Sequence, residues 1–298
     1  MMTKEDLALA HALADAAGSV IRPRFRGEYD HERKADRSPV TEADRAAEAV
    51  MRKLIEDRFP DDGIIGEEYG THNENAGRQW VLDPIDGTIS FMAGRPIFGT
   101  LIALMQDGWP VLGVIDQPVA RERWVGQLGA GTTFNGAPIT TRPCKDLREG
   151  SLATSSPHYF APDQAMAYMQ LAEVMGGNER QGAIVYGGDC YNYGLLASGH
   201  LDVICEAGLA LYDYAALVPV VEGAGGTMSD WQGNPLDAQS ATTEEGRVIA
   251  LGDPARLDEV LEALGQAEAP DSPSPGATNQ TTILPKSGGF SFPIGDNE

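Results

Sequence analysis

The chain has 298 residues, of which 42% are hydrophobic and 22% are charged, a composition typical of a soluble globular protein of one or two domains. Its net charge of -22 argues against nucleic-acid binding, and an anionic substrate would be repelled unless a bound cation neutralised the site. There is no apolar run of the ~20 residues that a membrane span needs, no secretory signal and no CxxC pair among three cysteines, so a cytoplasmic protein that binds no membrane is expected.

Two amphipathic helices are expected near the N-terminus. Apolar residues recur at helical spacing over 3–25, after Thr3, whose side chain is a suitable N-cap. A second helix is predicted over 41–60. The segment between them, 27–39, is polar and broken by turn-forming residues, so a mobile loop is expected there.

A series of apolar segments then predicts a β-sheet. Strands are expected over 63–68 and 80–83, and 99–118 reads as two longer strands joined by a Gln-Asp-Gly turn. A further strand is predicted over 121–127. Each segment is too apolar to be fully exposed, and the pattern indicates an antiparallel sheet.

The second half of the chain alternates between helical and strand patterns, which is typical of a layered α/β structure. Helices are expected over 163–175, 189–199, 211–225 and 254–265, and strands over 182–187, 201–208 and 247–252.

The fold is therefore predicted to be α/β with two lobes. The N-terminal lobe would span 1–148 and the C-terminal lobe 149–266. From residue 267 onward the composition shifts to Pro, Ser, Gly, Thr and Asn, which cannot bury a core, so 267–298 is predicted to be a disordered tail.

Four acidic residues stand where predicted strands or helices begin or end. They are Glu67, Asp83, Asp86 and Asp213. Mg²⁺ takes oxygen ligands and keeps several waters, so a few carboxylates gathered at strand ends suit it. These four positions are candidate metal ligands.

The segment DPIDGT, which contains two of these aspartates, could also bind phosphate. Pro84 fixes the backbone, so that the aspartates on either side can point into one cavity, and the Ile85 carbonyl is left available as a ligand. Gly87 and Thr88 open a segment that can be helical, and the first N–H groups of a helix bind phosphate. Metal, phosphate and water are therefore expected to meet here.

Each acidic position also has a simpler interpretation. Asp86 and Gly87 taken alone are more often a hairpin turn. Asp213 is an ordinary N-cap candidate, and Glu67 could lie in a solvated loop. The combination in one chain favours the metal site.

Three segments resemble the signatures of the inositol monophosphatase superfamily. They are GEE at 66–68, DPIDGT at 83–88 and YDYAALVPVVEGAGG at 212–226, and the resemblance runs from about residue 5 to residue 265. It implies a five-layered αβαβα sandwich, usually a homodimer, that acts as a phosphatase with two or three Mg²⁺ ions per subunit and is inhibited by Li⁺.

The resemblance also implies roles for individual residues. The metal ligands would be Glu67, Asp83, the Ile85 carbonyl, Asp86, Asp213 and Asp44. Gly87 and Thr88 would contact the phosphate through backbone N–H groups. The catalytic residues would be Asp44, Thr88 and Glu67, with Asp44 and Thr88 orienting the attacking water. Lys34 matches a loop lysine near the active site.

The implied mechanism is an in-line displacement at phosphorus between two ions roughly 3.5–4 Å apart. One ion would lower the pKa of the attacking water, and the other would neutralise the leaving alkoxide. No covalent enzyme intermediate is needed. Without metal, the carboxylates would repel the phosphate.

Within the superfamily, the sequence is most similar to bacterial-type histidinol-phosphate phosphatases, through 98–118, 121–126, 187–209 and 212–226. The implied reaction is hydrolysis of L-histidinol phosphate in histidine biosynthesis. Asp189 stands where enzymes acting on polyols carry a small residue, and could form a charge-assisted hydrogen bond with the substrate ammonium. Glu206 matches a substrate-contacting position. Asp189 could equally be a helix N-cap.

Two departures from that subgroup bear on the substrate. Ile89 replaces an Arg or Lys, and no basic residue shortly precedes the Gly-Gly-Asp at 187–189. Either the phosphate or substrate contacts are weaker, or a residue from elsewhere supplies the charge. The alternative function is hydrolysis of inositol 1-phosphate or of a broader range of sugar phosphates and nucleotides. A non-catalytic scaffold is disfavoured because every metal carboxylate is present.

Overall fold

A computed structural model of the chain describes residues 2–27, 31–33, 39–176, 183–243 and 245–265. Residues Met1–Ala267 form one compact unit. The predicted tail, 267–298, lies outside the described residues, and the boundary predicted near residue 148 stays a prediction. In the described part of the chain, every helix is too short or too polar to cross a membrane.

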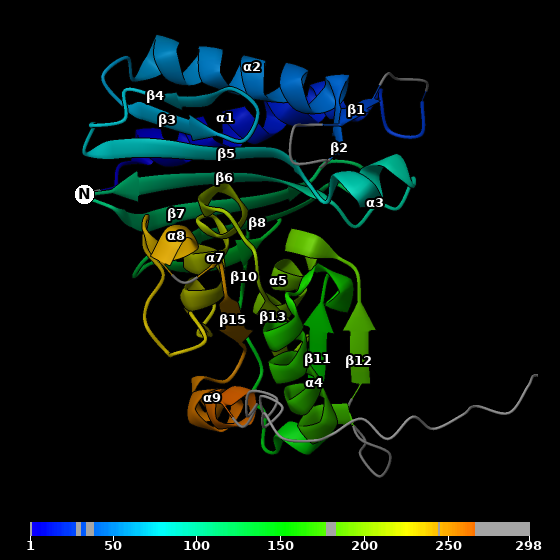
Figure 1. Cartoon of the computed structure of the whole chain (residues 1–298). Coiled ribbons are helices and arrows are strands. Elements are labelled where there is room, and N and C mark those ends of the chain that lie inside the picture. The colour runs from blue at the N-terminus through cyan, green and yellow to red at the C-terminus, as the bar shows by residue number, and fades with distance from the viewer. Residues whose placement is uncertain (1, 28–30, 34–38, 177–182, 244, 266–298) are drawn as a thin grey trace, which may run out of the picture. The chain divides into compact units, whose positions relative to one another are not determined.

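The described residues form two large sheets and a small two-stranded one (Figure 1). The first sheet has the spatial order β10 (Ala137–Ile139), β9 (Gly131–Phe134), β8 (Glu122–Gln127), β7 (Trp109–Gln117), β6 (Gly99–Gln106), β5 (Arg78–Asp86), β3 (Gly63–Gly66) and β4 (Gly70–His72). The second sheet has the order β12 (Ala183–Tyr186), β11 (Ser151–Thr154), β13 (Val203–Glu206), β15 (Val248–Leu251) and β14 (Thr227–Ser229). The small sheet pairs β1 (His31–Arg33) with β2 (Pro39–Thr41).

Helices cover both faces of the sheets and give five layers (Figure 1). The outer layer on the first sheet is α1 (Lys4–Ile21) and α2 (Glu42–Arg58). The middle layer, between the sheets, is α5 (Asp189–Ala197), α6 (Leu211–Tyr214) and α7 (Leu217–Gly223). The outer layer on the second sheet is α4 (Pro162–Gly176) and α9 (Leu257–Gly265). The remaining short elements are α3 (Thr88–Met92), α8 (Ser240–Thr243), η1 (Leu147–Glu149), η2 (Pro157–Tyr159) and η3 (Pro254–Arg256). The predicted αβαβα sandwich is confirmed.

The layers are held together by three buried hydrophobic clusters in the described part of the chain. One joins α1 and α2 to the first sheet, one surrounds the middle helices, and one joins α4 and α9 to the second sheet. The helical spacing of apolar residues in α1 explains its contribution, since Leu13, Ala17 and Ile21 are all fully buried. Thr3 caps this helix as predicted, in a capping box with Asp6.

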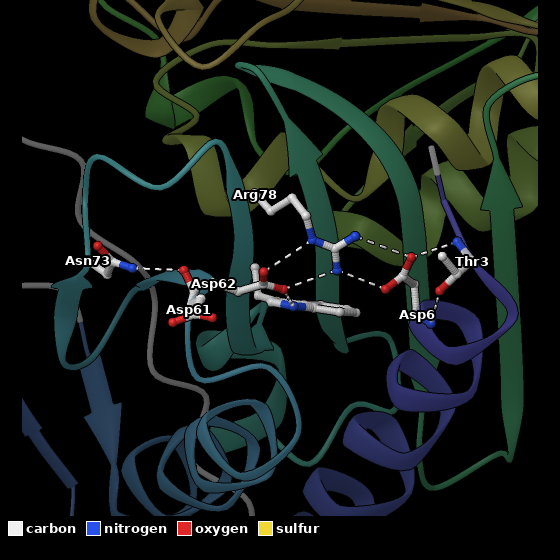
Figure 2. A network of polar contacts seen from close by, with 7 residues as sticks. Thr3, Asp6, Asp61, Asp62, Asn73 and Arg78 are labelled. Atoms are coloured by element: carbon white, nitrogen blue, oxygen red, sulfur yellow. Dashed lines mark hydrogen bonds and ion pairs between the residues drawn. The ribbon is translucent and has the colours of Figure 1, made fainter.

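A buried polar network anchors the start of β5, at the end remote from its aspartates (Figure 2). The Arg78 guanidinium donates to Asp6 at 2.8 Å and to Asp62 at 3.1 Å, and the Trp80 indole N–H donates to Asp62 at 3.0 Å. The network joins α1, the turn before β3 and the first sheet. It fixes β5 as a rigid element on which a site can be built.

Several expectations for the secondary structure are wrong. The first sheet is mixed, because β3 runs parallel to β5. The helix expected over 3–25 ends at Ile21, and the one expected over 211–225 is broken at Ala215 and Ala216 into α6 and α7. The strands β1, β2, β4, β9, β10, β11 and β14 were not predicted. They have only three or four residues each and lack the apolar run by which the equally short β3, β12, β13 and β15 were predicted.

Candidate active site

The DPIDGT segment lies at the end of β5, where the strand pairs irregularly with β6 between Asp83 and Asp86. Asp83 Oδ1 accepts the Ile85 N–H at 3.0 Å, and the Thr100 hydroxyl donates to the Pro84 carbonyl at 2.8 Å. The bulge is therefore hydrogen-bonded internally and to the neighbouring strand. It keeps both aspartates of the segment at one end of the sheet.

Three predicted metal ligands come together at this point. One carboxylate oxygen from each of Asp83, Asp86 and Asp213 lies within 4.8 Å of the others. Glu67, just after β3, lies within hydrogen-bonding reach of the Asp83 carboxylate, and its backbone N–H donates to the Leu82 carbonyl at 3.2 Å. Four acidic residues from three separate stretches of chain thus share one site.

The proximity of these carboxylates is electrostatically unfavourable. Burial, followed by the charges of Glu67, Asp86 and Asp213, raises the pKa of Asp83 well above its usual value. Burial and the charges of Asp189 and Asp213 do the same for Asp86. A hard divalent cation with oxygen ligands would relieve this repulsion, so the residues present fit a metal site.

Asp213, at the start of α6, accepts a backbone hydrogen bond and also belongs to the acidic cluster. It is the third residue of that helix, and its Oδ2 accepts the Ala210 N–H at 2.7 Å. The N-cap position itself belongs to Ala210, so the interpretation of Asp213 as the N-cap residue is wrong. The bond to Ala210 fixes its carboxylate next to Asp83 and Asp86.

Gly87 begins a helix and does not turn a hairpin. It has a left-handed backbone (φ 86°) and is the N-cap of α3, which follows directly after β5 (Figure 1). The Thr88 hydroxyl donates to the Ile85 carbonyl at 3.2 Å. Gly87, Thr88 and the Ile85 carbonyl, the predicted phosphate and metal contacts, are therefore adjacent to the aspartates.

Asp189 is directed at this loop from the middle layer. A Cβ on Gly87 would lie 2.6 Å from Asp189 Oδ2, and the Ser90 hydroxyl donates to the same oxygen at 3.2 Å. Asp189 has a positive φ of 43° and makes no capping bond in α5, where Gly188 is the N-cap. The N-cap interpretation is therefore wrong, and the carboxylate is directed toward the DPIDGT loop instead.

The charge state of Asp189 is set by competing effects. Burial raises its pKa above the usual value, and hydrogen bonds from Ser90 and Ser155 and the charge of Arg95 oppose this rise without cancelling it. Glu206, at the end of β13, accepts the Ser155 N–H at 2.6 Å and the Ser155 hydroxyl at 2.8 Å. Burial raises the pKa of Glu206 to about 7. Ser155 thus links the two carboxylates that were predicted to contact substrate.

A basic residue that the sequence motifs did not reveal lies beside them. Two guanidinium nitrogens of Arg95 are 3.2 and 3.3 Å from the position of a Cβ on Gly187, and Arg95 acts electrostatically on Asp189. Ile89, where a basic residue was expected, is 55% exposed. Arg95 follows α3 by three residues, so no motif spacing identifies it.

For the two remaining predicted residues, Asp44 and Lys34, no contact with the acidic cluster can be described. Asp44 is buried in the first turn of α2. Lys34 lies outside the described residues.

Comparison with known proteins gives consistent matches. A sequence model of the inositol monophosphatase family matches residues 2–268. Bifunctional phosphatase IMPL2, chloroplastic, of Arabidopsis thaliana is 47% identical over 262 residues, which cover 86% of this chain and 74% of that protein. A histidinol-phosphatase of Chlorobaculum parvum is 36% identical over 265 residues, covering 88% and 98% of the two chains. A solved structure of an inositol monophosphatase from Zymomonas mobilis has 48% identity and a TM-score of 0.78, and the match covers 88% of this chain and 98% of that one.

Proposed function

Because the chain belongs to the inositol monophosphatase family of metal-dependent phosphatases, we propose that it hydrolyses L-histidinol phosphate to L-histidinol and phosphate with Mg²⁺. Phosphatase activity on small phosphomonoesters follows from the family. The identity of the alcohol and of the metal is our proposal. A cytoplasmic place in histidine biosynthesis is part of it, supported by three buried cysteines that form no disulfide.

The acidic cluster would hold the metal. The ligands in this proposal are Glu67, Asp83, Asp86, the Ile85 carbonyl, Asp213 and, for a further ion, Asp44. When bound, Mg²⁺ would lower the pKa of the attacking water and neutralise the leaving oxygen. The amides of Gly87 and Thr88 would bind the phosphate, and Asp44 and Thr88 would orient the water.

The position of Asp189 carries the proposal for the substrate. Its carboxylate lies against Gly87, beside the proposed phosphate position, and Ser155 connects it with the buried Glu206. A neutral polyol has no positive charge to compensate two carboxylates, whereas histidinol phosphate carries an ammonium group. A charge-assisted hydrogen bond to that group would favour the amino alcohol.

Hydrolysis of inositol 1-phosphate is the second candidate. It is favoured by the similarity to the inositol monophosphatase of Zymomonas mobilis, at 48% identity. The Arabidopsis relative is described as bifunctional, so the two activities could also coexist in this chain.

A substrate panel tests the proposal. Phosphate release would be measured with histidinol phosphate, inositol 1-phosphate, a sugar phosphate and a 3'-nucleotide, each with Mg²⁺ and with EDTA. The expected result is the highest kcat/KM for histidinol phosphate and loss of activity in EDTA. The variant Asp83→Asn serves as a control for contaminating phosphatases. Faster turnover of inositol 1-phosphate would decide for the second candidate.

We also propose that the chain forms a homodimer, which would cover an apolar surface next to β12. The exposed apolar side chains there come from η2, α4 and β12, and β12 is an edge strand among the described residues. They are Tyr159, Met166, Met169, Val185 and Tyr186. Light scattering should give a dimer, and Met169→Glu should give monomers; a monomeric wild type would refute this part.

A further inference from the structure

Glu48 is a buried carboxylate outside the metal cluster, in the middle of α2. Its side chain is fully buried, an unusual position for a glutamate. Oε2 accepts the Glu68 N–H at 2.7 Å, and Oε1 accepts the Tyr69 N–H at 3.2 Å. Arg52, one turn later in α2, donates to Oε1 at 2.7 Å. The charge of Glu48 is therefore both paired and hydrogen-bonded, as a buried carboxylate requires.

These bonds fix the backbone on the C-terminal side of Glu67. The Glu67 N–H is bonded to the Leu82 carbonyl on β5, and the next two N–H groups are bonded to Glu48. A hydrogen bond to β5 thus fixes the backbone on the N-terminal side of the Glu67 side chain, and hydrogen bonds to α2 fix it on the C-terminal side. The Glu67 side chain leaves the backbone between the two anchors, toward Asp83.

The packing around this loop leaves little freedom for another arrangement. Any side chain on Gly66 would collide with the Glu48 carboxylate, so the chain passes directly over it. Arg52 also donates to the Gly70 carbonyl and so anchors the other end of the same loop. A single ion pair in α2 thereby holds the whole turn between β3 and β4.

We propose that Glu48 is a positioning residue of the metal site, which orients Glu67 toward the cation through the Glu68 and Tyr69 amides. This inference rests on the proposed role of Glu67 as a metal ligand. Groups that hold a ligand in place affect metal affinity by about 10- to 100-fold when removed. A residue that only stabilised the fold would lower stability and leave metal affinity unchanged.

The test compares Glu48→Gln with the wild type and with Asp202→Asn. Glutamine keeps one acceptor oxygen but turns an NH₂ group toward amide donors, so one of the two backbone bonds is lost. Asp202 is a matched control because it is also buried, pairs with Arg142 and accepts the Ser151 N–H at 2.8 Å, at the opposite end of β13 from Glu206. Both variants lose a similar carboxylate.

Mg²⁺ binding to the metal-free proteins would be measured by titration calorimetry, together with thermal unfolding in EDTA. For Glu48→Gln we expect at least about tenfold weaker Mg²⁺ binding and a recovery of kcat at high Mg²⁺. For Asp202→Asn we expect wild-type Mg²⁺ affinity with a lower unfolding temperature. Glu48→Ala should bind Mg²⁺ more weakly still, and the glutamine variant carries the test if the alanine variant does not fold.

Unchanged Mg²⁺ affinity in Glu48→Gln, or an equal loss in Asp202→Asn, would overturn the inference. Failure of the proposed function has a different signature, because the wild type would then hydrolyse inositol 1-phosphate faster than histidinol phosphate, or none of the tested phosphomonoesters. Calorimetry of Mg²⁺ binding does not depend on that result.

Discussion

The backbone N–H of Cys190 donates a hydrogen bond of 2.5 Å to the carboxylate of Asp86, a residue 104 positions earlier in the chain. Asp86 ends β5 of the first sheet, and Cys190 lies in the first turn of α5, which follows β12 of the second sheet. This bond ties the loop that carries the acidic cluster to the helix that carries Asp189. The candidate site is therefore a junction between the two sheets.

Asp83→Asn should separate metal binding from folding. We expect phosphatase activity to fall by more than about 100-fold, since removing a ligand should exceed the effect of its supporting residues. The metal-free protein should become more stable at pH 7, because the raised pKa of Asp83 means that its ionised form destabilises the folded state. Urea unfolding in EDTA measures the second effect, and a less stable variant would contradict it.

Asp189→Ala should discriminate between substrates. The KM for histidinol phosphate is expected to rise about tenfold, the value of one charge-assisted hydrogen bond. The KM for inositol 1-phosphate should rise less, because a polyol offers no positive charge. Steady-state kinetics on both substrates measure the two values. Equal changes would assign Asp189 a role in shaping the loop and none in choosing the alcohol.

The preference for histidinol phosphate should increase with pH through about 7. The pKa of Glu206 is raised to about 7, chiefly by burial and against hydrogen bonds from Ser155 and Thr154, so its ionised fraction in the free enzyme grows over this range. Only the ionised form attracts an ammonium group. The quantity to plot is the ratio of kcat/KM for histidinol phosphate to that for inositol 1-phosphate. Glu206→Gln should flatten this ratio against pH; an unaltered slope would rule out Glu206 as its source.

Arg95→Ala should weaken phosphoester binding. Arg95 supplies positive charge beside Asp189, so its removal leaves the anionic substrate closer to uncompensated carboxylates. We expect kcat/KM to fall about tenfold, and Arg95→Lys to restore part of it. Arg121→Ala is the control, since that exposed arginine lies in the turn between β7 and β8. A similar loss in both variants would indicate a general effect of net charge.

Arg78→Ala should reduce stability without changing the site. The substitution leaves Asp6 and Asp62 without their shared cation. Because Arg78 is partly exposed, we expect the free energy of unfolding to fall by about 2–3 kcal/mol. Burial opposes ionisation of Asp6, but hydrogen bonds from Arg78 and Thr3 outweigh it and lower its pKa. The stabilisation by Asp6 is thus present above its usual pKa of 3.8 and is lost as the pH falls through the lowered value. Urea unfolding at pH 7 and pH 3 would measure this, and KM should stay at the wild-type value.

The sequence could predict those site residues that lie within a short motif or next to a recognisable strand or helix end. Asp83 and Asp86 lie within one motif, and Glu67 and Asp213 are each next to a recognisable strand end or helix start. Arg95 and Glu48 have no such signal, because each acts through a contact with a distant segment. Only the packed structure brings these segments together.

The fold was predictable to a similar extent. The long helix α1 was identified by its helical period and the long strand β6 by its continuous apolar run, and the layered α/β class followed from the order of the elements. The parallel pairing of β3 with β5 was missed, because alternation of apolar residues says nothing about strand direction. The break between α6 and α7 was missed because the residues around it, 214–221, are all apolar or small and buried, so no helical period shows there.

The contact between Asp189 and Gly87 limits how this scaffold could be given a new specificity. The proposed metal-binding loop comes from one sheet and the proposed substrate-contacting carboxylate from the helix after the other, so residue 189 can be exchanged without replacing any of the proposed ligands. A smaller residue there would open space above Gly87. Any larger one would press on the glycine whose left-handed backbone starts α3. A site for bulkier alcohols should therefore be obtained with smaller side chains at position 189, and larger side chains there should disturb the loop.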